Sequence, residues 1–294
     1  MTAKDKDSLH NLIEKELNSN DKILKPDFSK QAGRELMAFY LQTKFHQLVN
    51  FDSKANQPMF NYVKDDFIQN FSCRLVSEPK KRIMVGITGE SASGKSTLCK
   101  AISSVIRSFN MPVSVLATDS YFNDISDLIK KYGSFDALRD NGYDVDSPES
   151  FQLDILQKDL KSLAEGKDIY APEYLPNGTG VSVPKSKFIS SNKIIIVEGM
   201  ATMYEGIKDI FDVKVYVETD INIRKERFLH RAFTERNQDF ENAKKHWNYI
   251  LVAGEKYIKP SKCYADLVLN GSSNMEYFCQ LLEYLHTITN NFEV

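Results

Sequence analysis

IMVGITGESASGKST, residues 83–97, is the stretch that decides the fold of this chain. Its first six residues form an apolar run typical of a buried strand, and residues 89–96 have the spacing G-x-x-x-x-G-K-S. Small residues at this spacing let successive backbone N–H groups turn inward around polyphosphate oxygens. The lysine then reaches the terminal phosphates and the hydroxyl reaches Mg²⁺. We therefore expect a nucleoside triphosphate to contact Gly89, Glu90, Ser91, Ala92, Ser93, Gly94, Lys95, Ser96 and Thr97.

The sequence around this loop favours ligand binding over a plain glycine turn between two core elements. An amphipathic helix is predicted directly after the loop, with apolar positions at Leu98, Ile102, Val105, Ile106 and Phe109. Farther along, apolar runs typical of buried parallel strands lie at residues 113–117, 193–199, 213–217 and 265–269. Helices are predicted from Ser147 to about Gly166, around Trp247, and over 275–288. This alternation predicts a three-layer α/β fold with a mainly parallel sheet.

Carboxylates stand at the ends of two predicted strands. Asp119 follows the run 113–117, and Glu198 follows Ile194-Ile195-Ile196-Val197. Because α/β folds place their chemistry at the carboxyl ends of parallel strands, both side chains are expected beside the phosphate loop. Residues 169–183, in contrast, are rich in turn residues, and no strand is predicted there.

Residues 1–78 are predicted to form a helical extension in front of the α/β domain that contains the phosphate loop, residues 79–294. Helical spacing is expected near residues 9–17, 28–49 and 59–71, and Pro79-Lys80-Lys81 is the expected boundary. The extension either docks a partner or covers part of the core. We favour a cover, because no residue cluster in it carries recognisable chemistry.

Composition narrows the class of protein further. A net charge of −2 and 27% charged residues disfavour a broadly cationic nucleic-acid binder. The longest apolar runs are too short to cross a bilayer, so no membrane partner is expected and a cytoplasmic location is predicted. Four cysteines without C-x-x-C spacing are expected to be reduced thiols. A homo-oligomer is compatible with the sequence.

The order of several motifs along residues 81–273 resembles the phosphoribulokinase and uridine kinase family, and within it the uridine kinases. Residues 118–122, TDSYF, are similar to the family's D-S-F-Y segment, and residues 143–151 to Y-N-F-D-H-P-D-A-F. Residues 196–199, IVEG, resemble its V-x-E-G strand, and residues 259–266 its P-x-K-x-x-A-D segment. The resemblance implies a P-loop kinase fold and transfer of the ATP γ-phosphate to a hydroxyl of a small molecule.

The resemblance also implies roles for individual residues. Lys95 and Arg231 would stabilise the transferring phosphate, and Asp119 would accept the proton of the attacking hydroxyl. Mg²⁺ is expected at Ser96 and Glu198. ATP is further expected at Arg227, Arg231 and Arg236, and the small-molecule acceptor at Asp119, Tyr121, Asp146 and Tyr174. The alternatives are a turn role for Asp119 and a capping or salt-bridging role for Glu198.

This chain departs from the family where uridine kinases read the base. Thr179 stands at the usual histidine and Val181 at the usual arginine. Phe228 replaces one arginine of R-R-x-x-R-D, and Gln238 replaces a later arginine. An apolar replacement discriminates weakly, so we expect specificity to be loosened or moved, with uridine and cytidine used poorly.

Two other functions fit the sequence. Pantothenate kinase, which carries a long N-terminal extension and a T-D-G-F segment, is a related alternative. A nucleotide-dependent switch without small-molecule kinase activity is an alternative from another class. Acceptor-stimulated ADP release would separate the kinases from the switch.

Overall fold

The computed structural model describes residues 31–78, 81–175, 177–235 and 238–290. The chain divides into two compact units, residues 81–271, and residues 1–80 together with 272–294. The sequence-based boundary instead places residues 272–294 with the kinase core, so the two divisions differ in this segment.

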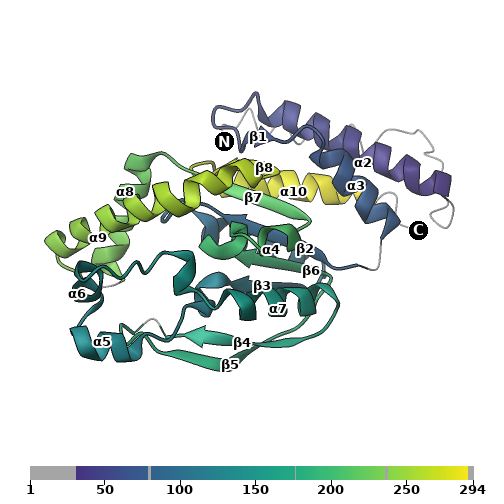
Figure 1. Ribbon diagram of the computed structural model, residues 1–294. Helices are drawn as coiled ribbons and strands as arrows, with labels where there is room; N and C mark the ends of the chain where they lie inside the picture. Colours follow the sequence, from purple (N-terminus) through teal and green to yellow (C-terminus); the bar gives the residue numbers. More distant parts are fainter. Residues whose placement is uncertain (1–30, 79–80, 176, 236–237, 291–294) are drawn as a thin grey trace. The chain divides into compact units, whose positions relative to one another are not determined.

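Residues 81–271 are built on a parallel sheet with the strand order β8-β7-β2-β6-β3 (Figure 1). The central strand β2 (Ile83–Thr88) pairs in parallel with β6 (Ile194–Glu198) and β7 (Val213–Glu218). On the outside, β3 (Val113–Ala117) pairs with β6, and β8 (Leu267–Asn270) with β7. The predicted parallel sheet is thus confirmed. β6 and β3 lie on one side of β2, and β7 and β8 lie on the other side.

Helices cover both faces of this sheet. On one face, Met84, Leu116 and Ile195 lie in a core cluster with three fully buried leucines of α7 (Leu153–Ala164). Burial of each leucine contributes about 1.5–3 kcal/mol. On the other face, α4 (Lys95–Ser108) packs against β2, β3 and β6, as right-handed crossovers require. The result is the predicted three-layer arrangement.

An antiparallel hairpin that was not predicted follows α7. It joins β4 (Ile169–Tyr174) to β5 (Ser182–Ile189), with Ile169 opposite Ile189. Pro172 lies at a shift of register between Ala171 and Glu173. A proline at an irregularity hides the alternating pattern of a strand, so turn residues dominate the local sequence.

Four helices lie at the end of the sheet where the strands have their carboxyl termini (Figure 1). They are α5 (Ser126–Tyr132), α6 (Phe135–Asp140), α8 (Ile221–Thr234) and α9 (Phe240–Ala253). Before α7, the predicted helix start at Ser147 is wrong, since Pro148–Ser150 form a 3₁₀ turn. Phe151 is extended, and its ring stacks on Phe122 at 4.2 Å.

The other unit contains α2 (Gln31–Asp52), β1 (Phe60–Val63), α3 (Phe67–Ser77) and α10 (Met275–Asn290). The predicted helix over 59–71 is wrong in its first half. The Asp52 carboxylate accepts hydrogen bonds from the backbone N–H groups of Met59 and Phe60, at 3.0 and 2.9 Å, which holds these residues outside a helix. The segment predicted at residues 9–17 lies outside the described residues. In the described part of the chain, no helix combines the length and apolarity that a membrane span needs.

Candidate functional site: a phosphate loop facing a cavity

The loop after β2 has the backbone that its glycines predict. Gly89 has φ +146° and a Cβ there would lie 2.4 Å from the carbonyl oxygen of Val217. Gly94 has φ +102° and is the N-cap of α4, whose first residue is Lys95. Residues 89–97 therefore combine a tight turn with a helix N-terminus, an arrangement that attracts phosphate. The Ser93 hydroxyl is buried without a hydrogen-bond partner among the described atoms, and a ligand could supply one.

Lys95, Ser96 and two acidic residues meet at the carboxyl edge of the sheet. Glu198 ends β6 and pairs with Ile87 of β2 on one side and Ala117 of β3 on the other. Its Oε1 accepts a hydrogen bond from the Ser96 hydroxyl at 3.2 Å. Asp119 follows β3 directly, in a 3₁₀ turn. The structure thus brings these four predicted residues together.

The charged side chains of this group shift one another's pKa values. Burial lowers the pKa of Lys95, whereas the nearby Glu198 and Asp119 carboxylates raise it. Burial raises the pKa of Glu198, and Lys95 acts against that shift. The Lys95 ammonium also donates to the backbone oxygen of Glu90 at 3.1 Å, within the loop. A cation is therefore held beside two carboxylates where phosphates are expected.

A buried ion pair that was not predicted from the sequence joins the phosphate loop to α8. Arg224 of α8 is only 3% exposed, and its guanidinium lies 2.7 Å from the Glu90 carboxylate. Its Nε donates to the backbone oxygen of Ser91 at 3.1 Å, and the guanidinium also lies over the Trp247 ring. Arg224 is therefore a structural partner of the loop, and the Glu90 side chain is engaged by it.

The other arginines of α8 are placed differently. Arg227 donates to the backbone oxygen of Gly271 at 3.1 Å and approaches that of Ser93 at 3.5 Å, so it lies against the loop. Arg231 is more than half exposed and pairs with Glu235 at 3.2 Å. Arg236 lies outside the described residues.

The predicted acceptor residues are not all accessible. Tyr121 is fully buried in the core and its hydroxyl donates to Asp159 at 2.9 Å, so a substrate-binding role gains no support. Asp146 is half-buried, and burial raises its pKa while Arg139 lowers it. Asp119 also raises the pKa of Asp146, so Asp146 is close enough to feel the charges of both Asp119 and Arg139. Tyr174 and Arg139 line a cavity.

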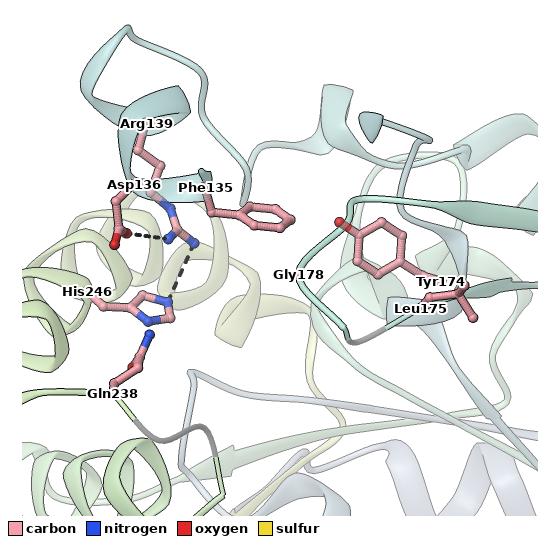
Figure 2. Close-up of a pocket in the computed structure, with 8 residues that line it drawn as sticks. All are labelled: Phe135, Asp136, Arg139, Tyr174, Leu175, Gly178, Gln238 and His246. Atoms are coloured by element: carbon pink, nitrogen blue, oxygen red, sulfur yellow. Dashed lines mark hydrogen bonds and ion pairs between the residues drawn. The ribbon is translucent and has the colours of Figure 1, made fainter. Parts of the chain in front are cut away.

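This cavity, of about 310 Å³, lies among four segments of the chain (Figure 2). Its lining residues are Phe135, Asp136, Arg139, Tyr174, Leu175, Gly178, Gln238 and His246. Figure 2 shows the Phe135 ring and the Tyr174 ring pointing toward each other, with Arg139, His246 and Gln238 along one side. Of this set, sequence reasoning singled out only Tyr174 as a site residue. Phe135, Arg139 and His246 had no motif that could have marked them.

Known proteins resemble this chain in sequence and in fold. The model of the phosphoribulokinase / uridine kinase family matches residues 84–276. A uridine kinase from Clostridium tetani is 33% identical over 196 residues, which cover 65% of this chain and 87% of that protein. Uridine-cytidine kinase A from Dictyostelium discoideum is 30% identical over 203 residues, or 67% of this chain. This chain spans only 38% of the length of that relative.

The fold of this chain is similar to that of one solved structure with a TM-score above 0.5. A kinase assigned to a fructose transport system in Silicibacter sp. TM1040 superposes with a TM-score of 0.51 at 18% identity. The match covers 64% of this chain and 90% of that one, and at this identity it shows the fold alone. Together with the family match and the motif order, it confirms the predicted P-loop kinase fold. The chain belongs to the phosphoribulokinase / uridine kinase family.

Proposed function

We propose that this protein transfers the γ-phosphate of ATP to a hydroxyl group of a small molecule, in the manner of its uridine kinase relatives. The observation that supports this most directly is the convergence of Lys95, Glu198 and Asp119 at one edge of the sheet. A protein that only binds a nucleotide needs the loop and the metal-binding groups. The carboxylate of Asp119 is the additional group that an acceptor hydroxyl needs.

The residues present fit ATP and Mg²⁺. ATP supplies the phosphoryl group, and Mg²⁺ neutralises charge on its phosphates when both are bound. The loop backbone and Lys95 would hold the phosphates. Ser96 and Glu198 would hold Mg²⁺, because hydroxyl and carboxylate oxygens are ligands it prefers. Among the described residues, no group of three or more His, Cys, Asp or Glu could hold a metal unaided, so phosphate oxygens would complete its shell.

Each remaining residue has one role in this proposal. Asp119 accepts the proton of the attacking hydroxyl, and Lys95 stabilises negative charge on the transferring group. Asp146 hydrogen-bonds a hydroxyl-bearing part of the acceptor. Arg231, whose pair with Glu235 is solvent-exposed and weak, would exchange that partner for a phosphate oxygen of ATP. Cytoplasmic location and homo-oligomerisation stay predictions.

The experiment is acceptor-dependent ADP release by the full chain with ATP and Mg²⁺. The panel contains uridine, cytidine, ribose and pantothenate, and mass spectrometry identifies the product. Stimulation by one acceptor together with its phosphorylated product supports the proposal. Tight ATP binding without stimulation by any acceptor contradicts it and favours a nucleotide switch.

A further inference from the structure

A π-helical turn continues α9 and contacts both ends of the site described above. It spans Gly254–Ile258, and its last hydrogen bond runs from the backbone N–H of Lys259 to the oxygen of Gly254. Turns of this i→i+5 type are rare and occur frequently at functional sites. The proposed function gives no role to the turn, although its contacts reach the phosphate loop and the segment that carries Asp146.

The first and last residues of this turn are buried and well fixed. A Cβ on Gly254 would lie 2.9 Å from Oε1 of Glu90, so the backbone of the turn rests against a side chain of the phosphate loop. Glu90 is itself held by its buried pair with Arg224 at 2.7 Å. At the other end, Ile258 is 2% exposed in the core, and its oxygen accepts from the Ser261 hydroxyl at 2.6 Å. The turn is therefore a firm support for the side chains between these two residues.

Tyr257 connects this turn to the segment that precedes α7. Its ring packs against the core cluster of the sheet, which limits the positions that its hydroxyl can take. The hydroxyl donates a hydrogen bond to Oδ2 of Asp144 at 2.7 Å. The ammonium of Lys256 lies 3.6 Å from the same oxygen, which is longer than a hydrogen bond. Tyr257 is thus the residue of the turn that makes a short, directed contact with this segment.

Asp144 organises the backbone around Asp146. Its Oδ1 accepts from the backbone N–H of Asp146 at 3.3 Å, as aspartate side chains do when they stabilise a turn. Its backbone oxygen accepts from the Ser150 hydroxyl at 2.7 Å and from the N–H of Ser147 at 3.3 Å. One oxygen of the Asp144 carboxylate therefore holds the backbone of Asp146, while the other oxygen is held by Tyr257.

The backbone of Asp146 is also held on its carbonyl side. Its oxygen accepts from the Tyr204 hydroxyl at 3.3 Å. This hydrogen bond and the one from the Asp146 N–H to Asp144 are both long, so neither holds the residue firmly by itself. The orientation of the Asp146 side chain therefore depends on how well the Asp144 carboxylate is fixed by Tyr257.

We propose that Tyr257 is a positioning residue for the acceptor, because its hydroxyl holds Asp146 in place through Asp144. The inference rests on the proposed function, in which Asp146 hydrogen-bonds the acceptor. Tyr257 acts only through Asp144 and is not a catalytic residue. Because the same turn rests against Glu90, the place of Asp146 is set relative to the phosphate loop.

The first test is Tyr257→Phe, which removes the hydroxyl and keeps the ring in the core. The acceptors are uridine, cytidine, ribose and pantothenate, and each one that is phosphorylated is measured. We expect kcat/KM for the acceptor to fall about five- to tenfold and the KM of ATP to stay within about twofold. Tyr264→Phe, in the 3₁₀ turn Lys259–Tyr264 that follows, is the matched control because it removes the hydroxyl of an exposed tyrosine. Unchanged kcat/KM in Tyr257→Phe, or an equal loss in the control, would overturn the proposal.

A second comparison separates positioning from a general loss of stability. If Tyr257 acts through Asp146, Tyr257→Phe should change kcat/KM by less than about twofold when it is introduced into Asp146→Ala. A loss of stability would instead lower kcat/KM by the same factor in both backgrounds. That result would overturn the proposal.

Failure of the proposed function is distinguishable from failure of this inference. If no acceptor is phosphorylated, the proposed function fails, and hydrogen–deuterium exchange followed by mass spectrometry then tests Tyr257. In Tyr257→Phe, the amides of residues 143–151 should exchange about five- to tenfold faster, while those of residues 83–97 keep their original rate. Equal exchange of residues 143–151 in the two proteins would overturn the proposal.

Discussion

The phosphate end and the acceptor end of this site are built in different ways. The phosphate end, residues 89–97, is one continuous segment whose groups are mainly backbone N–H donors and one helix N-terminus. It is fixed by the buried Arg224–Glu90 pair and by the Thr219 hydroxyl, which donates to the Ser93 oxygen at 2.8 Å. The acceptor end is the cavity of Figure 2, lined by side chains of four segments.

The two ends also differ in how their walls are held together. α6 and α9, which carry Arg139 and His246, are joined by exposed contacts of Asp140 with Lys245 and Tyr249. Exposed ion pairs contribute little stability. Residues at the acceptor end can therefore differ between members of a family with little loss of stability, while the phosphate end stays the same. Substitutions at the two ends should accordingly affect different kinetic constants.

Lys95→Ala should have the largest effect. Because the ammonium is the cation nearest the expected phosphates, its loss should lower kcat on the order of 10³-fold or more. The fold should persist, since the only hydrogen bond that Lys95 donates in the described structure is to a backbone oxygen of its own loop. The measurement is ADP release, with circular dichroism as the check on folding and Lys100→Ala as the control. Unchanged turnover would contradict the assignment of residues 89–97 as the phosphate-binding segment.

Asp119→Asn should lower kcat on the order of 10²-fold or more and leave ATP binding intact, because the amide cannot accept the hydroxyl proton. Calorimetry with a non-hydrolysable ATP analogue measures the binding separately. A change confined to the KM of the acceptor would reassign Asp119 from the reaction centre to the acceptor end.

Asp146→Ala should raise the acceptor KM by about tenfold and leave the KM of ATP unchanged, through loss of a charged hydrogen bond to the acceptor. Steady-state kinetics with either substrate varied gives both constants. An increase in both would show that the two ends are not independent at this residue.

Activity and stability should change in opposite directions with pH, because both depend on the protonation of Glu198. Burial raises the pKa of Glu198 above its ordinary value of 4.5, so the folded protein binds its proton more tightly than the unfolded chain. As pH rises from 4.5 through the raised pKa, the free energy of unfolding should therefore fall, while activity, which needs the carboxylate, should rise a few-fold. Glu198→Gln should remove this part of the stability change. A pH profile of stability identical in both proteins would contradict the assignment.

The sequence predicts the phosphate end well because its groups are adjacent in the chain. The parallel strands were also predictable, since buried strands are continuous apolar runs such as residues 194–197. Arg139 and His246, in contrast, are 107 residues apart, and only the fold brings them together. Ser91 and Arg224 are separated by 133 residues, and neither residue type signals burial. The β4–β5 hairpin was missed because a proline interrupts its pattern.

Asp140→Asn should have the smallest effect and probes how firmly the acceptor end is held. The Asp140 carboxylate accepts from the Lys245 ammonium at 2.6 Å and from the Tyr249 hydroxyl at 2.5 Å, both across the α6–α9 contact. These hydrogen bonds, first that from Lys245, lower the pKa of Asp140 below its ordinary value of 3.8, so the carboxylate is lost only as pH falls through that lower value. The substitution should therefore raise the acceptor KM by about twofold, equally at every pH from about 6 to 9, without changing the KM of ATP. Steady-state kinetics across that range checks this, with Asp127→Asn on α5 as a matched control that loses an exposed pair with Lys130. A tenfold loss in Asp140→Asn alone would mean that the α6–α9 contact positions Arg139 much more tightly than its exposure implies, and a rise in the KM of ATP would mean that α9 transmits the change to the phosphate loop.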